Sequence, residues 1–187
     1  MAAAITNVVG FDDAPFAREH RGDVMLIGAV CSRTRLDGVL TGRVRRDGAN
    51  ATRRMLELVH DSQFHGHVRA VLLQGIAVAG FNVIDIHGLA RELGVPVVVV
   101  ARRPPNLPAI RRALMNCPGW RRKWRLIERA GPMEPCAGIY IQRAGIERAG
   151  AEALIRATIL HGKLPEPLRV AHLIAGGITT GVSRGRA

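Results

Sequence analysis

Residues 23–45 read DVMLIGAVCSRTRLDGVLTGRVR, and this stretch decides the fold. Two runs rich in Val, Ile and Leu cover residues 23–32 and 38–45, and a polar turn around residues 35–38 separates them. An earlier run over residues 5–11 has the same character and ends at the acidic pair Asp12-Asp13. Three such runs with short connections are typical of consecutive antiparallel strands. We therefore expect an antiparallel meander at the start of the chain.

After residue 50 the pattern changes to an alternation of helix and strand. The spacing of apolar residues predicts helices over residues 51–59 and 82–93, the first with Asn50 as its N-cap. Strands are expected at 68–73 and 96–101, short helices at 109–116 and 121–129, an edge strand at 139–142, and closing helices at 147–160 and 168–178. This predicts an α/β fold with a mixed sheet, in which an antiparallel meander continues into two parallel strands flanked by helices. The order of elements is that of ribonuclease H-like folds.

Length and composition narrow the class of protein. The 187 residues suit one domain over 1–187, and 48% hydrophobic residues are ample for a packed core. The apolar runs are shorter than the ~20 residues that a membrane span needs. No signal peptide is visible, so we expect a soluble cytoplasmic protein. The three cysteines Cys31, Cys117 and Cys136 are far apart, which argues against a disulfide scaffold and a zinc ribbon.

The net charge of +12 is distributed unevenly along the chain. All but two of the 27 basic residues are Arg, which pairs with phosphate bidentately, although codon bias explains that preference equally well. Codon bias does not explain the clustering of basic residues within 102–129, where Glu128 is the single acid. The residues expected to contact a polyanion are Arg102, Arg103, Arg111, Arg112, Arg121, Arg122, Lys123 and Arg125. Since every Asp lies at or before position 85, the pattern favours a nuclease over a plain nucleic-acid binder.

The expected topology brings several polar residues to one edge of the sheet. The first and third strands of a meander point the same way, so Asp12, Asp13 and Asp47 lie near one edge. A parallel strand beside the first would bring Gln74 there too. Open α/β sheets bind ligands at this carboxyl edge. Carboxylates are the preferred ligands of Mg²⁺, which activates water for phosphodiester hydrolysis.

Each candidate residue also has a structural explanation that the sequence leaves open. Asp12-Asp13 precedes Ala-Pro and Asp47 precedes Gly, and both are common turn sequences. Asn82 and Asp85 have the spacing of a helix cap. His172 could act as a general acid or orient a water, but a helical His is often a packed or surface residue. Residues 75–80 match no nucleotide-binding motif, so no nucleotide cofactor is expected.

Four segments together carry a resemblance to a known family. They are VGFDDAPF (9–16), DGANAT (47–52), LQGIAVAGFNVID (73–85) and LPEPLRVAH (164–172). These segments resemble the motifs of the endonuclease dU family, an archaeal group long described as uncharacterised. That family is similar in turn to endonuclease V, a ribonuclease H-like repair nuclease that depends on Mg²⁺.

The resemblance implies cleavage of DNA at or near deoxyuridine, the product of cytosine deamination. Asp12 matches the metal-binding Asp of the first strand. Endonuclease V has an Asp at the end of its fourth strand, where this chain has Gln74, and this chain lacks the Pro-Tyr-Ile-Pro wedge of endonuclease V. We therefore look to Asp13, Asp47 and Asp85 as further ligands.

The hypothesis from the sequence is a metal-dependent DNA endonuclease. Asp12, Asp13, Asp47 and Asp85 would hold Mg²⁺ or Mn²⁺, Gln74 or Asn82 would position the attacking water, and His172 would assist. DNA is the expected partner. Two alternatives remain: a non-catalytic nucleic-acid-binding protein whose aspartates are caps and turns, and a ribonuclease or nucleotide-processing enzyme that uses the same edge.

Overall fold

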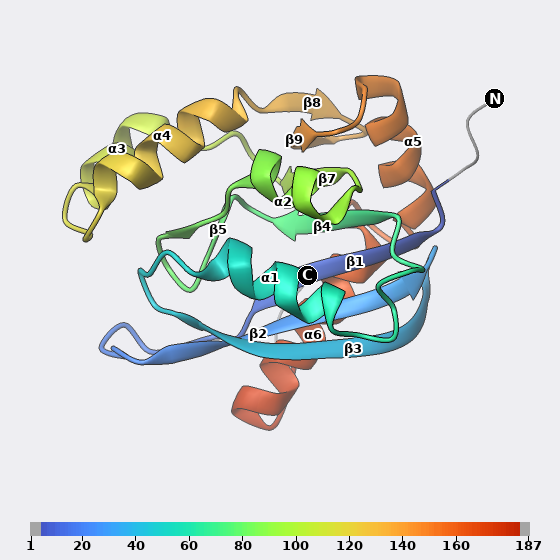
Figure 1. Cartoon of the computed structure of the whole chain (residues 1–187), viewed down its shortest axis with the longest axis horizontal. Coiled ribbons are helices and arrows are strands. Elements are labelled where there is room, and N and C mark those ends of the chain that lie inside the picture. The colour runs from blue at the N-terminus through green and yellow to red at the C-terminus, as the bar shows by residue number, and fades with distance from the viewer. Residues whose placement is uncertain (1–4, 184–187) are drawn as a thin grey trace.

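A mixed sheet of seven strands organises the structure, a computed structural model that describes residues 5–183 (Figure 1). The strand order across the sheet is β3-β2-β1-β4-β7-β9-β8. The strands are β1 Asn7–Asp13, β2 Asp23–Ser32, β3 Arg35–Arg45, β4 Ala70–Gln74, β7 Val97–Ala101, β8 Glu134–Cys136 and β9 Ile139–Ala144. A separate two-stranded ribbon pairs β5 (Ala77–Val78) with β6 (Asn82–Val83).

The pairing confirms the predicted meander and the parallel strands beside it. Strand β2 runs antiparallel to both β1 and β3, whereas β4 runs parallel to β1 and β7 runs parallel to β4. The parallel register pairs Phe11 with Leu73. Asp12 and Gln74, the next residue on each strand, are therefore neighbours at the carboxyl edge of the sheet, as the sequence predicts.

The helices form layers on both faces of the sheet. They are α1 Ala51–His60, α2 Ile86–Leu93, α3 Leu107–Leu114, α4 Trp120–Ala130, α5 Arg148–Thr158 and α6 Glu166–Thr180. Helices α1 and α2 lie in front of the sheet in Figure 1, α6 lies behind it, and α3 and α4 extend past its carboxyl edge. None of the helices within 5–183 is both long and apolar enough to cross a membrane.

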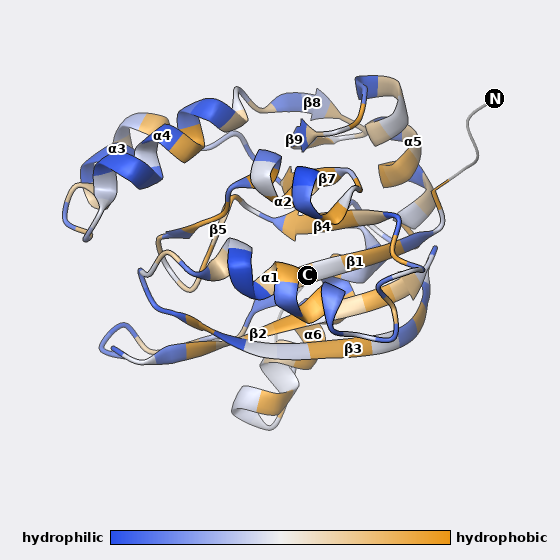
Figure 2. Ribbon diagram, in the orientation of Figure 1, coloured by the Kyte–Doolittle hydropathy of each residue, from blue (hydrophilic) through white to orange (hydrophobic). Residues whose placement is uncertain are grey.

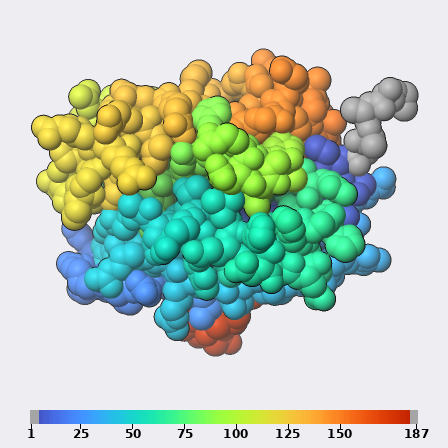
Figure 3. Space-filling view, in the orientation of Figure 1, coloured from blue at the N-terminus to red at the C-terminus, as the bar shows by residue number. Residues whose placement is uncertain are grey.

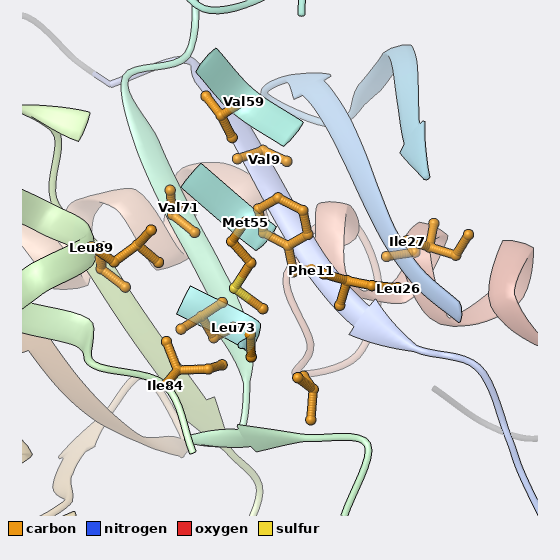
Figure 4. Close-up of a cluster of buried hydrophobic side chains, with 14 of the residues drawn as sticks. Val9, Phe11, Leu26, Ile27, Met55, Val59, Val71, Leu73, Ile84 and Leu89 are labelled. Atoms are coloured by element: carbon orange, nitrogen blue, oxygen red, sulfur yellow. The ribbon is translucent and has the colours of Figure 1, made fainter. Parts of the chain in front are cut away.

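Successive side chains of the central strands point to opposite faces of the sheet, so the core forms two layers, one on each face. Val9 and Phe11 of β1 pack on the α1 side with Met55 (Figure 4). Val8 belongs to a second cluster on the other face, together with Leu154 of α5. These side chains are fully or almost fully buried. The two apolar layers hold β1 and β4 rigidly, and this rigidity fixes the positions of the residues at the strand ends.

Two elements differ from the sequence prediction. Strand β9 is not an edge strand, because it pairs with β7 on one side and with the short β8 on the other. The expected helix over 82–93 begins only at Ile86, because Asn82 and Val83 pair with the β5 strand. Asn50 precedes α1 but makes no side-chain cap; the amide of Ala51 donates instead to Oδ1 of Asn82, at 3.0 Å.

Candidate active site

Asp12 and Asp13 end β1 and point to opposite faces of the sheet, as successive strand residues do. Oδ2 of Asp12 lies 2.8 Å from Nδ1 of His172 on α6. Oδ2 of Asp13 accepts a hydrogen bond of 3.0 Å from the amide of Ala79, in the turn between β5 and β6. Asp12 is only 7% exposed. Residues from the two ends of the chain therefore meet at one buried carboxylate.

The position of His172 depends on how closely α6 approaches β1. A Cβ added to Gly10 would lie 2.5 Å from the carbonyl carbon of Pro167, so only glycine allows this contact. Glu166, beside it, is buried and pairs with Arg169 at 2.5 Å, and the hydrogen bond from Arg169 lowers the pKa of Glu166. The start of α6 is thus fixed on the sheet, and His172 follows between one and two helical turns later.

The two carboxylates are poorly compensated by the groups around them. Burial raises the pKa of Asp12, and His172 offsets only part of that effect. Burial and the neighbouring charge of Asp12 raise the pKa of Asp13 to about 6. A buried and a half-buried carboxylate that repel each other favour a bound cation, because the cation stabilises both ionised forms.

Gln74 adds a third oxygen on the Asp12 side of the edge. Its Oε1 is buried, and no group within residues 5–183 donates a hydrogen bond to it. Carboxylate and amide oxygens are hard ligands, and Mg²⁺ is usually held by one or two protein carboxylates together with water and substrate phosphate. The oxygens of Asp12, Asp13 and Gln74 are thus of the chemical type that Mg²⁺ or Mn²⁺ prefers as ligands.

The structure does not assemble the larger ligand set expected from the sequence. In the described part of the chain, no group of three or more His, Cys, Asp and Glu side chains is placed to hold a metal. Asp47 and Asp85 are the two predicted ligands that are used elsewhere. The carboxylates of both residues accept hydrogen bonds from backbone amides and pair with arginines, and these contacts hold them apart from the carboxylate of Asp12.

Asp47 also supports the β5–β6 turn, which Asp13 contacts. Its Oδ1 accepts the amide of Phe81 at 2.8 Å, and its own amide donates to the carbonyl of Ala79 at 2.9 Å. Ala79 adopts a positive φ of 48°, a conformation that needs such support. Asp13 and Asp47 thus hold one strained residue between them, and Asp47 contributes to the site by positioning this turn.

Asp85 and Asn82 have structural roles. Asp85 is the N-cap of α2, where it accepts from the amide of Gly88 at 2.8 Å and pairs with Arg129. Burial alone would raise the pKa of Asp85, but these partners outweigh it, and the pKa is lowered. The side-chain amide of Asn82 is buried and donates to Arg45 and Asn50. The contacts of both side chains are thus structural: Asp85 caps α2, and Asn82 joins the β5–β6 ribbon to the start of α1.

The basic residues on and before α3 and α4 form an exposed surface past the carboxyl edge (Figures 1 and 2). The exposed members are Arg102, Arg103, Arg111, Arg112, Arg121, Arg122 and Arg125. Lys123 differs from the expectation, because it is 3% exposed and its Nζ donates to the carbonyl of Asp47 at 2.5 Å. An amphipathic helix must turn one face inward, and Lys123 lies on that face. It attaches α4 to the segment around residue 47. In Figure 3 the yellow atoms of the α3–α4 region border the cyan atoms of the region that contains α1.

One residue pair near the site was not among the candidates from the sequence. Glu166 and Arg169 anchor the start of α6. In the sequence, only the family resemblance of residues 164–172 drew attention to this segment. The signal was present, since an acid and an arginine three residues apart on a helix form a pair. The burial of Glu166 could not be read from that spacing.

Comparison with solved structures identifies which known fold this chain shares. The chain superposes on endonuclease V from Ciona intestinalis, solved with a DNA that contains inosine, with a TM-score of 0.58, 13% identity, and coverage of 91% of this chain and 84% of that one. The catalytic domain of human endonuclease V gives a TM-score of 0.59 at 16% identity, covering 92% and 82%. The fold is thus that of endonuclease V.

The sequence comparisons define the family. A family model described as Endonuclease dU matches residues 4–179, and the chain belongs to this family. A UPF0215 protein from Deinococcus radiodurans is 57% identical over 97% of this chain and 93% of its own length. A crystal structure of a protein of unknown function from Archaeoglobus fulgidus has a TM-score of 0.88 and 33% identity, covering 94% of this chain and 99% of that one.

Proposed function

We propose that this protein is a metal-dependent endonuclease that cuts DNA at or near deoxyuridine. The observation that carries the proposal is the mutually repelling pair of carboxylates, buried Asp12 and half-buried Asp13, next to an oxygen of Gln74 that has no hydrogen-bond partner within residues 5–183. Membership of the endonuclease dU family and the endonuclease V fold support it. The site lies at the carboxyl edge of the sheet, where α/β folds bind ligands.

Each residue of the site has a separate role in this proposal. Asp12, Asp13 and Gln74 would hold the ion through their oxygens. When bound, Mg²⁺ or Mn²⁺ supplies positive charge at the phosphate and lowers the pKa of a bound water. With Asp12 ionised, the N–H at Nδ1 of His172 would donate a hydrogen bond to it, and Nε2 of this half-exposed ring would face water or the leaving oxygen for proton exchange.

The arginine surface on α3 and α4 would bind the phosphates that flank the cut. Two of its guanidinium groups stack on indole rings: Arg111 lies 5.4 Å from the ring centre of Trp124, and Arg121 lies 5.0 Å from that of Trp120. Stacking restrains the side chains and leaves their N–H groups exposed for phosphate.

The test is cleavage of labelled duplexes that carry one deoxyuridine, compared with the same duplex carrying deoxycytidine. Each substrate is incubated with the protein in EDTA, in Mg²⁺ and in Mn²⁺. We expect cutting only with a metal and faster cutting of the deoxyuridine duplex. Asp12→Asn should lower the rate by at least about 100-fold, because it removes a ligand and the partner of His172.

Asp61→Asn is the matched control, since Asp61 is exposed just after α1 and away from the carboxyl edge. This variant should cut like the wild type. If duplex binding persists but no metal supports cutting, the protein is the non-catalytic nucleic-acid binder that the sequence left open.

A further inference from the structure

An apolar cavity of about 230 Å³ lies next to the candidate active site, at the carboxyl ends of β4 and β7. The β5–β6 ribbon, α3 and α4 enclose it, with Ile76, Phe81, Ile110 and Ile127 among its walls. Pockets for drug-sized ligands measure ~300–1,000 Å³, so this cavity suits one ring system rather than a whole nucleotide.

Gln142 of β9 is the polar side chain that lines this apolar cavity. It is 5% exposed, and its Nε2 donates to the carbonyl of Gly131 at 2.5 Å. This bond fixes the orientation of the amide group. Its Oε1 is left buried with no donor within the described residues. An unpartnered buried acceptor costs ~1–3 kcal/mol, and a ligand with a donor group would remove that cost.

The cavity and the carboxylates are joined through the same ribbon. Ala79, in the turn of this ribbon, bonds to Asp13, while Ile76 and Phe81 on either side of it line the cavity. A nucleotide whose phosphate lies at the carboxylates would thus have its base next to the ribbon. Enzymes that act on a damaged base commonly turn that base out of the helix into such a pocket.

We propose that this cavity receives one base turned out of the DNA, and that Gln142 is a specificity-determining residue whose buried Oε1, once the cavity walls shift to admit the base, accepts a hydrogen bond from the ring N–H of a deaminated base. This inference rests on the proposed function and deepens it. Deamination of cytosine converts N3 from an acceptor into an N–H donor. The N3–H of uracil would donate a hydrogen bond to Oε1 of Gln142. In cytosine N3 is an acceptor, so two acceptors would face each other. Thymine carries the same N–H, so the role of Gln142 is discrimination against cytosine.

The experiment compares duplexes with deoxyuridine, N3-methyldeoxyuridine or deoxycytidine at one position opposite guanine. The N3-methyl group removes the N–H and leaves the rest of uracil intact. Binding is measured by fluorescence anisotropy in EDTA, and cleavage is measured separately in Mg²⁺. We expect the wild type to prefer deoxyuridine over both other bases by at least about tenfold. Gln142→Leu should bind all three alike.

Two further variants separate this role from a loss of folding. Ala101→Leu places extra volume in the cavity from the end of β7, so it should also remove the base preference while duplex affinity from the arginine surface remains. Gln63→Leu changes an exposed glutamine near the other end of the sheet and should leave the preference unchanged. Thermal melts verify that each variant is folded.

The outcomes distinguish this inference from the proposed function. If the wild type cuts deoxyuridine and N3-methyldeoxyuridine equally, or Gln142→Leu keeps the preference over deoxycytidine, the base pocket is wrong and the nuclease stands. If no metal supports cutting but binding still depends on the N–H and on Gln142, the nuclease is wrong and the base pocket stands.

Discussion

Gln74 is the residue at which this chain departs most clearly from endonuclease V. Its buried oxygen has no hydrogen-bond partner among residues 5–183, so Gln74→Leu should leave the protein at least as stable as the wild type in EDTA. The same variant should lose part of the stabilisation that millimolar Mg²⁺ gives the wild type. Gln74→Glu should instead increase that stabilisation, because it adds a carboxylate of the same length. Thermal melts over a Mg²⁺ titration measure both effects, and unchanged titrations would place Gln74 outside the metal site.

Asp13 should make stability depend on pH in a way that is unusual for an aspartate. Its folded-state pKa of about 6 exceeds the unfolded value of 3.8, so its stabilising contribution is complete below pH ~4 and is lost as the pH rises through 6. Relative to Asp13→Asn, the metal-free wild type should lose up to ~3 kcal/mol between these pH values. Urea unfolding in EDTA at several pH values measures the difference, and saturating Mg²⁺ should reduce it.

At the scale of the element, the site depends on how closely α6 approaches β1. Gly10→Ala would force the backbone at Pro167 away and should destabilise the protein by ~1–3 kcal/mol, with a loss of metal-induced stabilisation because His172 moves with the helix. Gly177→Ala is the control on the same helix. A Cβ there meets nothing within 4 Å, so it should stabilise the protein by ~0.5–1 kcal/mol. Equal effects of the two variants would contradict the close approach.

The elements also show what the sequence can and cannot predict. The spacing of apolar and polar residues predicted the meander and the parallel strands. The convergence of Asp12 with Gln74 then follows from the directions of these strands. Asp47, Asp85 and Lys123 were assigned functional roles from their charge. Their actual partners are Phe81, Gly88 and Asp47, which lie 34, 3 and 76 residues away. Except for the local cap, such partners depend on tertiary packing that no local pattern specifies.

At the scale of the whole molecule, the +12 charge should make DNA binding strongly dependent on salt. Each neutralised phosphate adds about −0.9 to the slope of log affinity against log salt. Replacing Arg121, Arg122 and Arg125 with Ala should flatten this slope by up to ~3 and weaken all sequences alike. The control removes the same charge from α2 and α5, at Arg91, Arg148 and Arg156, and should change the slope less. Equal changes would mean that net charge, rather than the α3–α4 surface, sets affinity.

The contact between Asp12 and His172 spans 160 residues, nearly the length of the chain, and this separation affects how the protein is made. Long-range contacts form slowly, and a chain leaving the ribosome cannot complete this one until α6 has been synthesised. A product that stops after α4 already carries the arginine surface but lacks His172. Under the proposed function, such a fragment would carry the nucleic-acid-binding surface without a complete catalytic centre. In the proposed function, the charge that attracts DNA is therefore synthesised first, and the histidine that assists cleavage is synthesised last.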